Sequence, residues 1–278
     1  MQTRPKISTV MLCWNRLVLS KRCLASYLET ITVPHELFVI DNASTDATKQ
    51  WVESLRGTTG VSGILRMARN DPASALNEGL QCCNGELLHI MENDYEYLPG
   101  WDRYVLDRFA RIAELGQLAP VTGYDYVRAG HHRGLVYVAR DNVCTTSFLR
   151  REVFFDAGVR VHGHYAGNCY PDDYDLSTQI LRAEWLVAWS DVEIAHHIGL
   201  DSDEQRRDPD YYIRDYALKL FSAARLRGQA RRWLKLDFHD TARLVRRLAR
   251  VCRFKLHRLA ARRGADHGTK RDFPPRSG

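Results

Sequence analysis

Short apolar runs alternate with helical patterns along the first 200 residues of the chain. Runs of strand length are followed by segments in which apolar side chains recur every three or four positions. The predicted strands cover residues 7–12, 36–41, 63–68, 86–92, 185–190 and 192–197. The predicted helices cover residues 16–29, about 46–55, 73–81, 101–114, 151–157 and 173–183, with short strands between 117 and 160. This alternation predicts an α/β fold with a mostly parallel sheet and flanking helices.

The pattern becomes helical and basic beyond residue 208. Between residues 233 and 259 apolar side chains recur at gaps of mostly three or four, with Arg and Lys between them. This spacing predicts a basic amphipathic helix, interrupted near Asp240. The last residues, GTKRDFPPRSG, have the composition of a disordered tail. We therefore expect an α/β domain over residues 1–205, a helical basic extension over 206–265 and a tail over 266–278.

The charge of the chain is divided unevenly between these parts. Residues 211–278 contain 19 Lys and Arg and 5 Asp, a net charge of +14, whereas residues 1–210 contain 21 basic and 29 acidic residues, a net charge of −8. The basic segment either meets an anionic partner or forms a solvated helical surface. An anionic membrane surface is one such partner, and packing on the core or on a second subunit is the alternative. The acidic body and the lack of base-reading motifs argue against nucleic acid.

The composition is that of an ordinary soluble protein, with 45% hydrophobic and 27% charged residues. No run of 18 or more apolar residues occurs, and the N-terminus lacks the layout of a secretory signal. The seven cysteines form no CxxC pair, which favours reduced thiols and no zinc site. We therefore expect a cytoplasmic protein, peripheral at the inner face of the membrane if the basic extension binds lipid.

Polar residues cluster where four of the predicted strands end, at 13–16, 41–46, 69–70 and 92–94. Ligands of open parallel sheets bind at the carboxyl ends of the strands. Glu92 and Asp94 follow an apolar strand and lie two apart, so both can face one Mg²⁺ or Mn²⁺ ion, with diphosphate oxygens completing its shell. The alternative for this pair is a solvent-exposed turn.

Two further groups carry titratable side chains. The run PDDYD (171–175) places several carboxylates together, which raises the pKa of at least one and suits a general base. An acidic helix N-terminus that complements the helix dipole explains the same run equally well. His196 and His197 end an apolar strand and could supply an imidazole to a metal, although a histidine in such a place is more often structural.

The order of these clusters resembles the family 2 glycosyltransferases. The resemblance rests on VMLCWNR, FVIDNASTDAT, ARNDPASALNEGL, ELLHIMENDYEYLPGW and PDDYDLSTQILRAEWLVAW, followed by VEIAHHIG, and it covers roughly residues 7–199. It implies a Rossmann-like sheet of the GT-A type, an inverting sugar transfer and a divalent metal (Mn²⁺ or Mg²⁺). The nucleotide-sugar half would be about residues 1–100 and the acceptor half about 101–205.

The resemblance also assigns roles to residues by their position in these motifs. The nucleotide-sugar site would comprise Cys13, Trp14, Asn15, Arg16, Asp41, Asn42, Ser44, Arg69, Asn77 and Asn93. The metal site would comprise Glu92, Asp94 and one of His196 and His197, with His197 preferred because His-x-Gly follows from it. Asp173 would be the general base, and Asp172 the acid before it.

Three positions depart from the usual pattern of the family. Glu92 replaces an Asp, Pro72 stands where R-N-x-G has its glycine, and Asp172 stands where Glu is common. The expected donor is a UDP-, GDP- or dTDP-linked sugar, and the expected acceptor is a hydroxyl of a glycan, a lipid-linked molecule or a small molecule. The competing functions are a nucleotidyltransferase, which would want a richer phosphate loop than CWNRLVLSK, and a non-catalytic binding protein of the same fold.

Overall fold

The computed structural model describes residues 5–120, 131–139, 143–162 and 173–200. The side chains of residues 173–175 and 200 are not described. The chain divides into two units, Met1–Ala217 and Leu218–Gly278, and all the described residues belong to the first. The predicted basic extension, the predicted tail and Asp172 lie outside the described residues.

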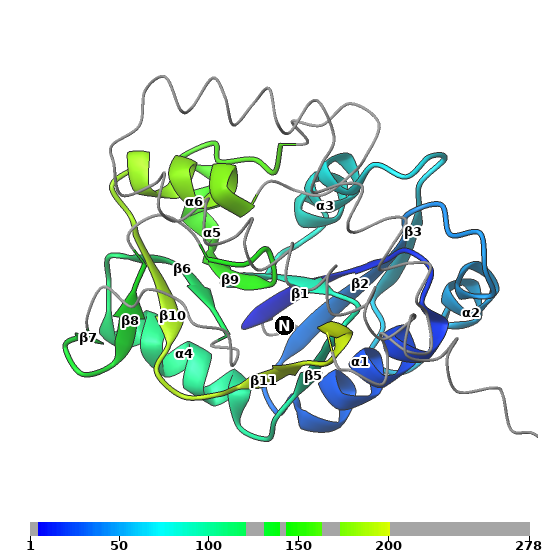
Figure 1. Ribbon diagram of the computed structural model, residues 1–278, viewed down its shortest axis with the longest axis horizontal. Helices are drawn as coiled ribbons and strands as arrows, with labels where there is room; N and C mark the ends of the chain where they lie inside the picture. The colour runs from blue at the N-terminus through cyan, green and yellow to red at the C-terminus, as the bar shows by residue number, and fades with distance from the viewer. Residues whose placement is uncertain (1–4, 121–130, 140–142, 163–172, 201–278) are drawn as a thin grey trace, which may run out of the picture. The chain divides into compact units, whose positions relative to one another are not determined.

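A nine-stranded sheet forms the centre of the described part, in the order β3-β2-β1-β4-β9-β6-β10-β8-β7 (Figure 1). Its strands are β1 (Ile7–Cys13), β2 (His35–Asp41), β3 (Gly63–Arg66), β4 (Leu87–Glu92), β6 (Leu115–Ala119), β7 (His131–His132), β8 (Val136–Val138), β9 (Ser147–Arg150) and β10 (Leu186–Ser190). Strands β3, β2, β1 and β4 run parallel, and so do β6 and β10. The prediction of an α/β fold with a mostly parallel sheet and flanking helices is confirmed.

Strand β9 runs antiparallel to both of its neighbours, β4 and β6. The short strands β7 and β8 form an antiparallel hairpin, whose β8 pairs with β10. The predicted strand over 192–197 is shorter than expected and lies outside the large sheet: β11 (Ala195–His197) pairs antiparallel with β5 (Tyr95–Tyr97). This small sheet brings the histidine pair beside the chain that follows β4.

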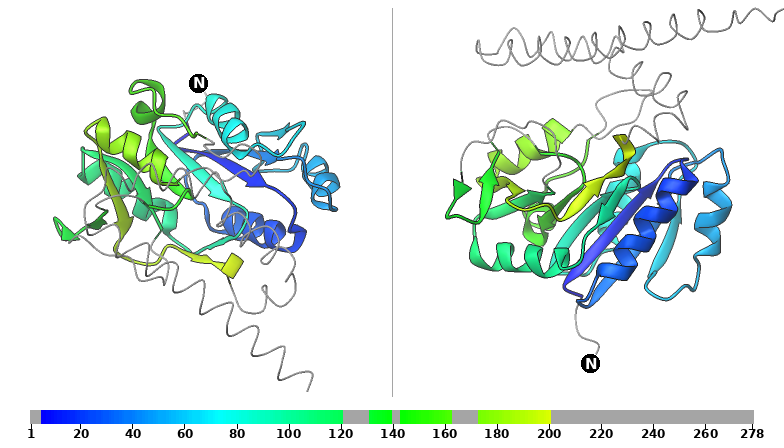
Figure 2. Two further views of the ribbon diagram at one scale, coloured as in Figure 1. Left: turned by 45° about the horizontal axis from the view of Figure 1, so that its top comes forward. Right: turned by 60° about the horizontal axis from the view of Figure 1, so that its bottom comes forward.

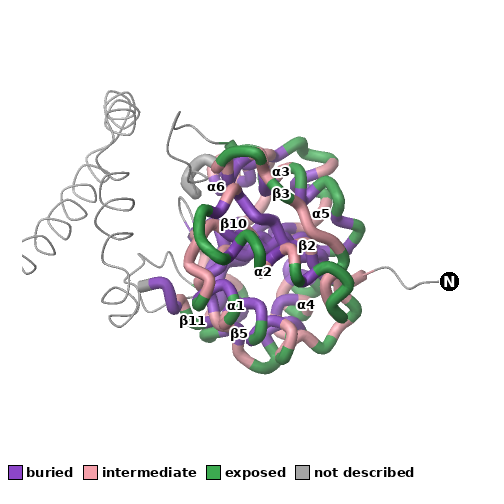
Figure 3. Tube along the Cα trace, turned by 90° about the vertical axis from the view of Figure 1, so that its right-hand side faces the viewer, coloured by how far each residue is buried: buried purple, intermediate pink, exposed green. Residues whose placement is uncertain are grey.

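The helices cover both faces of the sheet (Figures 1 and 2). They are α1 (Leu17–Thr30), α2 (Thr48–Ser54), α3 (Pro72–Gln81), α4 (Trp101–Arg111), α5 (Arg151–Phe155) and α6 (Asp173–Arg182), followed by the 3₁₀ turn η1 (Ile198–Leu200). Apolar residues of α1, α2 and α4 pack in one core cluster, and those of α3, α5 and α6 in a second. The central strands β1, β4, β6 and β9 are buried along most of their length, whereas β3 and β7 at the two edges of the sheet are not (Figure 3).

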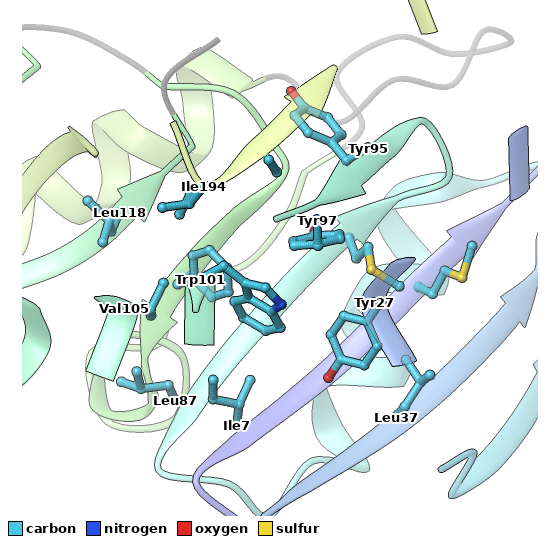
Figure 4. Packing of buried hydrophobic residues seen from close by; sticks show 14 of the residues in the cluster. Ile7, Tyr27, Leu37, Leu87, Tyr95, Tyr97, Trp101, Val105, Leu118 and Ile194 are labelled. Carbon is cyan, nitrogen blue, oxygen red and sulfur yellow. The ribbon is translucent and has the colours of Figure 1, made fainter. Parts of the chain in front are cut away.

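The core under α1 and α4 is rich in aromatic side chains (Figure 4). Trp101 is buried and its indole Nε1 donates to Thr30 Oγ1 at 3.0 Å. Gly100 precedes it in the left-handed conformation, with φ of 86°, which a glycine adopts without the strain that a Cβ brings. The run Pro-Gly-Trp after β5 is therefore a structural turn that seats an aromatic anchor at the start of α4.

His89 is the polar exception in this core. It is fully buried in the middle of β4, stacked on Phe148 at 4.1 Å between ring centroids. Its Nδ1 lies 3.2 Å from Thr9 Oγ1 and its Nε2 lies 2.9 Å from the Tyr97 hydroxyl. Burial holds the pKa of His89 well below its ordinary value, so the ring is neutral and both nitrogens have partners.

The register of the parallel strands aligns their carboxyl ends. Cys13 pairs with Asp41, Asp41 with Arg66, and Leu12 with Glu92. The chain leaves β1, β2 and β4 at this common edge, and the predicted polar clusters follow these strand ends. The edge is therefore the place where a ligand of this fold would bind.

Candidate active site

The loop after β1 has a strained backbone. Asn15 and Arg16 both have positive φ, 55° and 62°, which side chains other than glycine seldom adopt. Such strain costs about 1–3 kcal/mol per residue and persists where the surroundings over-determine the conformation. Here the side-chain oxygen Oδ1 of Asn15 accepts from the backbone amide of Thr45 at 2.8 Å. The backbone amide of Asn15 donates to Ser44 Oγ at 2.9 Å. The loops after β1 and β2 are thus held together by Asn15.

The loop after β2 is organised by a buried carboxylate. Asp41 is almost fully buried, and its Oδ1 accepts from the Ser44 amide at 3.0 Å across a tight turn. Ala43 inside this turn also has a positive φ of 60°. The DNAS run therefore forms a turn built around its own aspartate.

Asn93, directly after β4, is hydrogen-bonded to the loop after β1. Its side-chain amide donates to the Asn15 carbonyl at 3.1 Å and to Ser20 Oγ of α1 at 2.8 Å. The chain after β4 therefore rests directly on the strained loop after β1. Hydrogen bonds thus join the predicted polar clusters 13–16, 41–46 and 92–94.

Asp94 is the charged centre of this assembly. Its Oδ2 accepts from Arg16 Nη1 at 3.0 Å and lies 3.5 Å from His197 Nε2. Only 15% of the Asp94 side chain is exposed, and only 6% of the Arg16 side chain. The main-chain carbonyl of Asp94 accepts from the Ile198 amide at 2.9 Å and from the Gly199 amide at 3.3 Å. Residue 16 and residues 197–199 thus surround one carboxylate, although they are far apart in the chain.

Burial alone would disfavour the charged form of Asp94. The His197 imidazole and the Arg16 guanidinium outweigh that effect and hold the pKa of this carboxyl well below its ordinary value. Its second oxygen, Oδ1, is buried and has no hydrogen-bond partner among the described residues. Asp94 therefore has an ionised carboxylate with one buried oxygen whose hydrogen-bonding capacity is unused among the described residues.

His196 and His197 lie on opposite sides of β11. His197 is 17% exposed and faces Asp94, with its ring edge-on to Tyr95 at 4.8 Å between centroids. His196 is 48% exposed, and its Nδ1 lies 2.8 Å from Glu193 Oε1. The strand places only His197 beside the carboxylate, because neighbouring side chains of a strand point to opposite faces.

The Glu92 carboxylate hydrogen-bonds to Thr146, whereas the Asp94 carboxylate contacts Arg16 and His197. Its Oε2 accepts from Thr146 Oγ1 at 3.1 Å, and Thr146 Oγ1 in turn accepts from the Glu92 amide at 3.2 Å. Within the described ranges, no three His, Cys, Asp or Glu residues are grouped so that they could hold a metal ion by themselves. A metal at Asp94 would therefore complete its shell with oxygens from the donor or from water.

The residues predicted on the donor side hold the loops together. Asn42 donates to Asn70 Oδ1 at 2.7 Å and accepts from the Asp71 amide at 2.9 Å, so it joins the loops after β2 and β3. Asp71 caps α3 through the Ser74 amide at 3.2 Å, and Pro72 occupies the first helical turn. This N-terminal Pro explains the departure from R-N-x-G: here the residue starts a helix. The Arg69 side chain is 84% exposed, 3.3 Å from Asp71.

Asn77 lies on α3, and its side chain hydrogen-bonds to the backbone of residue 161, which precedes the predicted base Asp173 in the chain. Its Nδ2 donates to the Val161 carbonyl at 2.7 Å, and its Oδ1 accepts from the Val161 amide at 3.0 Å. Gln179 of α6 binds the backbone of Arg160 in the same way. Its side chain donates to the Arg160 carbonyl at 2.8 Å and accepts from the Arg160 backbone amide at 3.3 Å. Segment 159–162 is thus fastened to α3 on one side and to α6 on the other.

The remaining predicted residues have simpler environments. Cys13 is buried, which raises the pKa of its thiol, and its carbonyl accepts from the Asn42 amide at 2.8 Å. Trp14 is half-buried in the loop after β1. Asp173 is the first residue of α6, as predicted, although its side chain is not described. The structure therefore places the backbone of the predicted base and leaves its carboxylate as an expectation.

Gly199 is a site residue to which the sequence reading gave no role of its own. A Cβ at this position would lie 2.2 Å from Asp94 Oδ2 and 2.8 Å from Asp94 Cβ. Only a glycine lets the chain after His197 approach the carboxylate so closely. Its signal was the His-x-Gly spacing, which was used to choose between the histidines. Thr146 and Gln179 carried no local signal, because each contacts its partner across more than 15 residues.

The mostly parallel sheet with helices on both faces is consistent with a GT-A type, Rossmann-like fold. The glycosyl transferase family 2 model matches residues 8–168, more than half of the chain, and the chain belongs to this family. No curated protein matches the chain in a sequence search.

Solved glycosyltransferases share the fold at low sequence identity. TarS from S. aureus in complex with UDP-GlcNAc is 15% identical with a TM-score of 0.57, over 72% of this chain and 64% of that one. Mannosyltransferase PcManGT from Pyrobaculum calidifontis, in complex with GDP-Man and Mn²⁺, is 18% identical with a TM-score of 0.59, over 80% of this chain and 66% of that one. The chain thus spans slightly less than two thirds of each of these two solved chains, the first of which is residues 1–349 of TarS, and the likeness concerns the fold.

No helix among residues 5–120, 131–139, 143–162 and 173–200 is long and apolar enough to cross a membrane.

Proposed function

We propose that this glycosyltransferase moves a sugar from a nucleoside diphosphate sugar to an acceptor hydroxyl, with inversion at the anomeric carbon and with a divalent metal. The observation that carries the proposal is the buried Asp94 at the carboxyl edge of the sheet, which is kept ionised and whose buried Oδ1 has no hydrogen-bond partner among the described residues. The two fold neighbours were solved with UDP-GlcNAc and with GDP-Man and Mn²⁺, which supports a donor of this class.

The chemistry of the described residues fits a divalent cation. Asp94 supplies a carboxylate oxygen without a partner among the described residues, and His197 Nε2 lies 3.5 Å from its other oxygen. A carboxylate and an imidazole suit Mn²⁺, and the oxygens of a diphosphate suit Mn²⁺ and Mg²⁺ alike. When bound, the metal would neutralise the charge of the departing nucleoside diphosphate. We assign Asp94 and His197 to it. His196 faces Glu193 and Glu92 faces Thr146, so neither enters this set.

The nucleoside would lie over the interlocked loops 13–16 and 41–46. Asn15, Asp41 and Asn93 hold these loops in strained conformations through contacts within the chain itself. Such preorganisation lowers the cost of ordering the site on binding. Cys13, Asn42 and Asn77 act as supports of this surface, since their described contacts are with the chain itself.

Asp173 is our candidate for the general base. It opens α6, and the acceptor oxygen would attack the anomeric carbon while its proton passes to the Asp173 carboxylate. The bond from the anomeric carbon to the diphosphate oxygen breaks in the same displacement, and the nucleoside diphosphate leaves. The configuration inverts because attack and departure occur on opposite sides of that carbon. Asp172 precedes the base and would share its acidic environment.

Donor binding can be tested by thermal shift with a panel of UDP-, GDP- and dTDP-linked sugars, first with Mn²⁺ or Mg²⁺ and then with a chelator. We expect one donor class to raise Tm only with metal. Asp94→Asn should abolish this metal-dependent shift, whereas Glu193→Gln, which removes an exposed carboxylate beside His196, should keep it. Unchanged metal dependence in Asp94→Asn would refute the assignment. Binding without transfer to any acceptor would favour a non-catalytic protein of the same fold.

A further inference from the structure

Arg16 contacts the candidate metal ligand directly. Its position in the N-R motif implied a place in the loop that cradles the nucleotide base. The structure instead directs its guanidinium at Asp94 Oδ2, 3.0 Å away, and at the Gly199 carbonyl, 3.3 Å away. The side chain is almost completely buried, so this cation has little access to water. A buried charge of this kind requires a compensating partner, and Asp94 is that partner.

The backbone of Arg16 favours this arrangement. The residue immediately precedes α1 in the left-handed conformation, and its side chain makes no capping hydrogen bond to the helix. Asn93, next to Asp94, is fastened to the carbonyl of Asn15, next to Arg16. The two charged residues are therefore held together by their neighbours as well as by their own ion pair.

We infer that Arg16 is a built-in counter-charge that makes cation binding at Asp94 depend on the diphosphate of the donor. This inference rests on the proposed function. A histidine binds a metal ion as the neutral imidazole, so in the metal-bound site the charges of Asp94 and Arg16 cancel. A divalent cation without a donor then adds two uncompensated positive charges beside a guanidinium. The diphosphate of a sugar nucleotide carries two negative charges and restores the balance.

Repulsion between the Arg16 guanidinium and a bound cation couples cation binding to diphosphate binding. Like charges a few ångströms apart repel strongly where water is excluded, and this repulsion falls on a cation that arrives alone. A diphosphate removes it in two ways, because it brings opposite charge and offers oxygens that accept from the guanidinium. Metal and nucleotide should therefore bind together, and each should raise the affinity for the other by the same factor.

The test is the affinity of the full chain for Mn²⁺, measured from the electron paramagnetic resonance of free Mn²⁺ with and without UDP or GDP. In the wild-type protein we expect the matching nucleoside diphosphate to tighten Mn²⁺ binding at least about tenfold, and the nucleoside alone to have no such effect. In Arg16→Gln we expect Mn²⁺ alone to bind about tenfold more tightly than in the wild type. Arg16→Lys keeps the charge and should behave as the wild type. Arg22→Gln is the control, because Arg22 lies on α1 and pairs with the partly exposed Glu96 rather than with Asp94.

Two results would overturn the inference. One is Mn²⁺ binding to Arg16→Gln that is no tighter than to the wild type. The other, which needs no variant, is equal Mn²⁺ affinity of the wild type with and without nucleoside diphosphate. If instead the wild type binds no Mn²⁺ under either condition and Asp94→Asn behaves identically, the metal assignment of the proposed function fails, and the role of Arg16 fails with it.

Discussion

Replacing Gly199 by alanine should disable the site while leaving the fold intact. The new Cβ would lie 2.2 Å from Asp94 Oδ2 and 2.8 Å from both Cβ and Cγ of Asp94. Carbon contacts are comfortable at about 3.5 Å, so the chain at residue 199 or Asp94 itself must move by roughly 1 Å. Rotating the carboxylate alone does not remove the clash, because Asp94 Cβ is also too close. The backbone of the pair must therefore separate.

The consequence follows from what this separation breaks. The carbonyl of Asp94 accepts from the Ile198 and Gly199 amides, and the carbonyl of Gly199 accepts from Arg16. A displacement of about 1 Å in a catalytic group costs about 10²-fold in rate, and overpacking costs about 1–3 kcal/mol of stability. We expect Gly199→Ala to lose the metal-dependent thermal shift with the donor and about 10²-fold in kcat/KM, with a modestly lower Tm.

A matched control separates the local effect from general destabilisation. Gly63→Ala also adds a methyl group in a tight place, 3.0 Å from the Phe38 ring, but at the start of β3, away from the carboxyl edge. It should lower Tm and keep the metal-dependent donor shift. The reasoning would be refuted if Gly199→Ala bound donor and metal as the wild type does, or if Gly63→Ala lost that binding equally.

Four further predictions concern other parts of the chain. Asp173→Asn should lower kcat by about 10²–10⁴-fold with donor affinity nearly unchanged, and a large loss of donor binding instead would argue against its role as base. Asn77→Asp puts a carboxylate oxygen against the Val161 carbonyl, so urea unfolding should show a loss of about 1–3 kcal/mol; an unchanged midpoint would contradict the two-bond contact. The pKa of His89 is lowered in the fold, so its contribution to stability is complete above about pH 6.5 and should fall below it by up to about 1.4 kcal/mol per pH unit. His89→Phe should lack this part of the pH dependence in denaturation, and equal slopes for both proteins would refute it. The basic segment 211–278 should bring the chain to anionic vesicles in flotation assays at low salt and release it at high salt; no flotation at either salt would leave packing on protein as its role.

The local pattern was sufficient for most of the helices and strands. Alternating apolar runs and helical periods predicted β1, β2, β4, α1, α3 and α6 close to their observed bounds. These elements are long, or have clear ends such as Asp71-Pro72 before α3. The pairing of β9 between β4 and β6, and that of β11 with β5, could not be read in the same way. Short strands choose partners by the surface that the rest of the fold presents, and that surface is distant in sequence.

The sequence likewise predicted the residues of the candidate site but not their contacts. The spacing in Glu92-Asn93-Asp94 and in His-x-Gly marked the residues worth attention. It did not show that Asn93 fastens the loop after β1 or that Glu92 turns to Thr146. Nor did it show that His196 faces Glu193. Each of these facts depends on which groups the fold places within hydrogen-bond distance, and the partners are far apart in the chain.

The sequence by itself predicted the α/β fold class, because hydrophobic periodicity is a local property of the chain. Its motifs, through their resemblance to family 2 glycosyltransferases, predicted the class of enzyme, and its charges predicted an acidic body with a basic extension. The tertiary structure decided the electrostatics of the site. Arg16 contacts Asp94, 78 residues away in the chain, and Gly199, 183 residues away. Only folding brings these three residues together and buries them. Burial is what makes their pairing strong, since charges and close backbone contacts matter most where water is excluded.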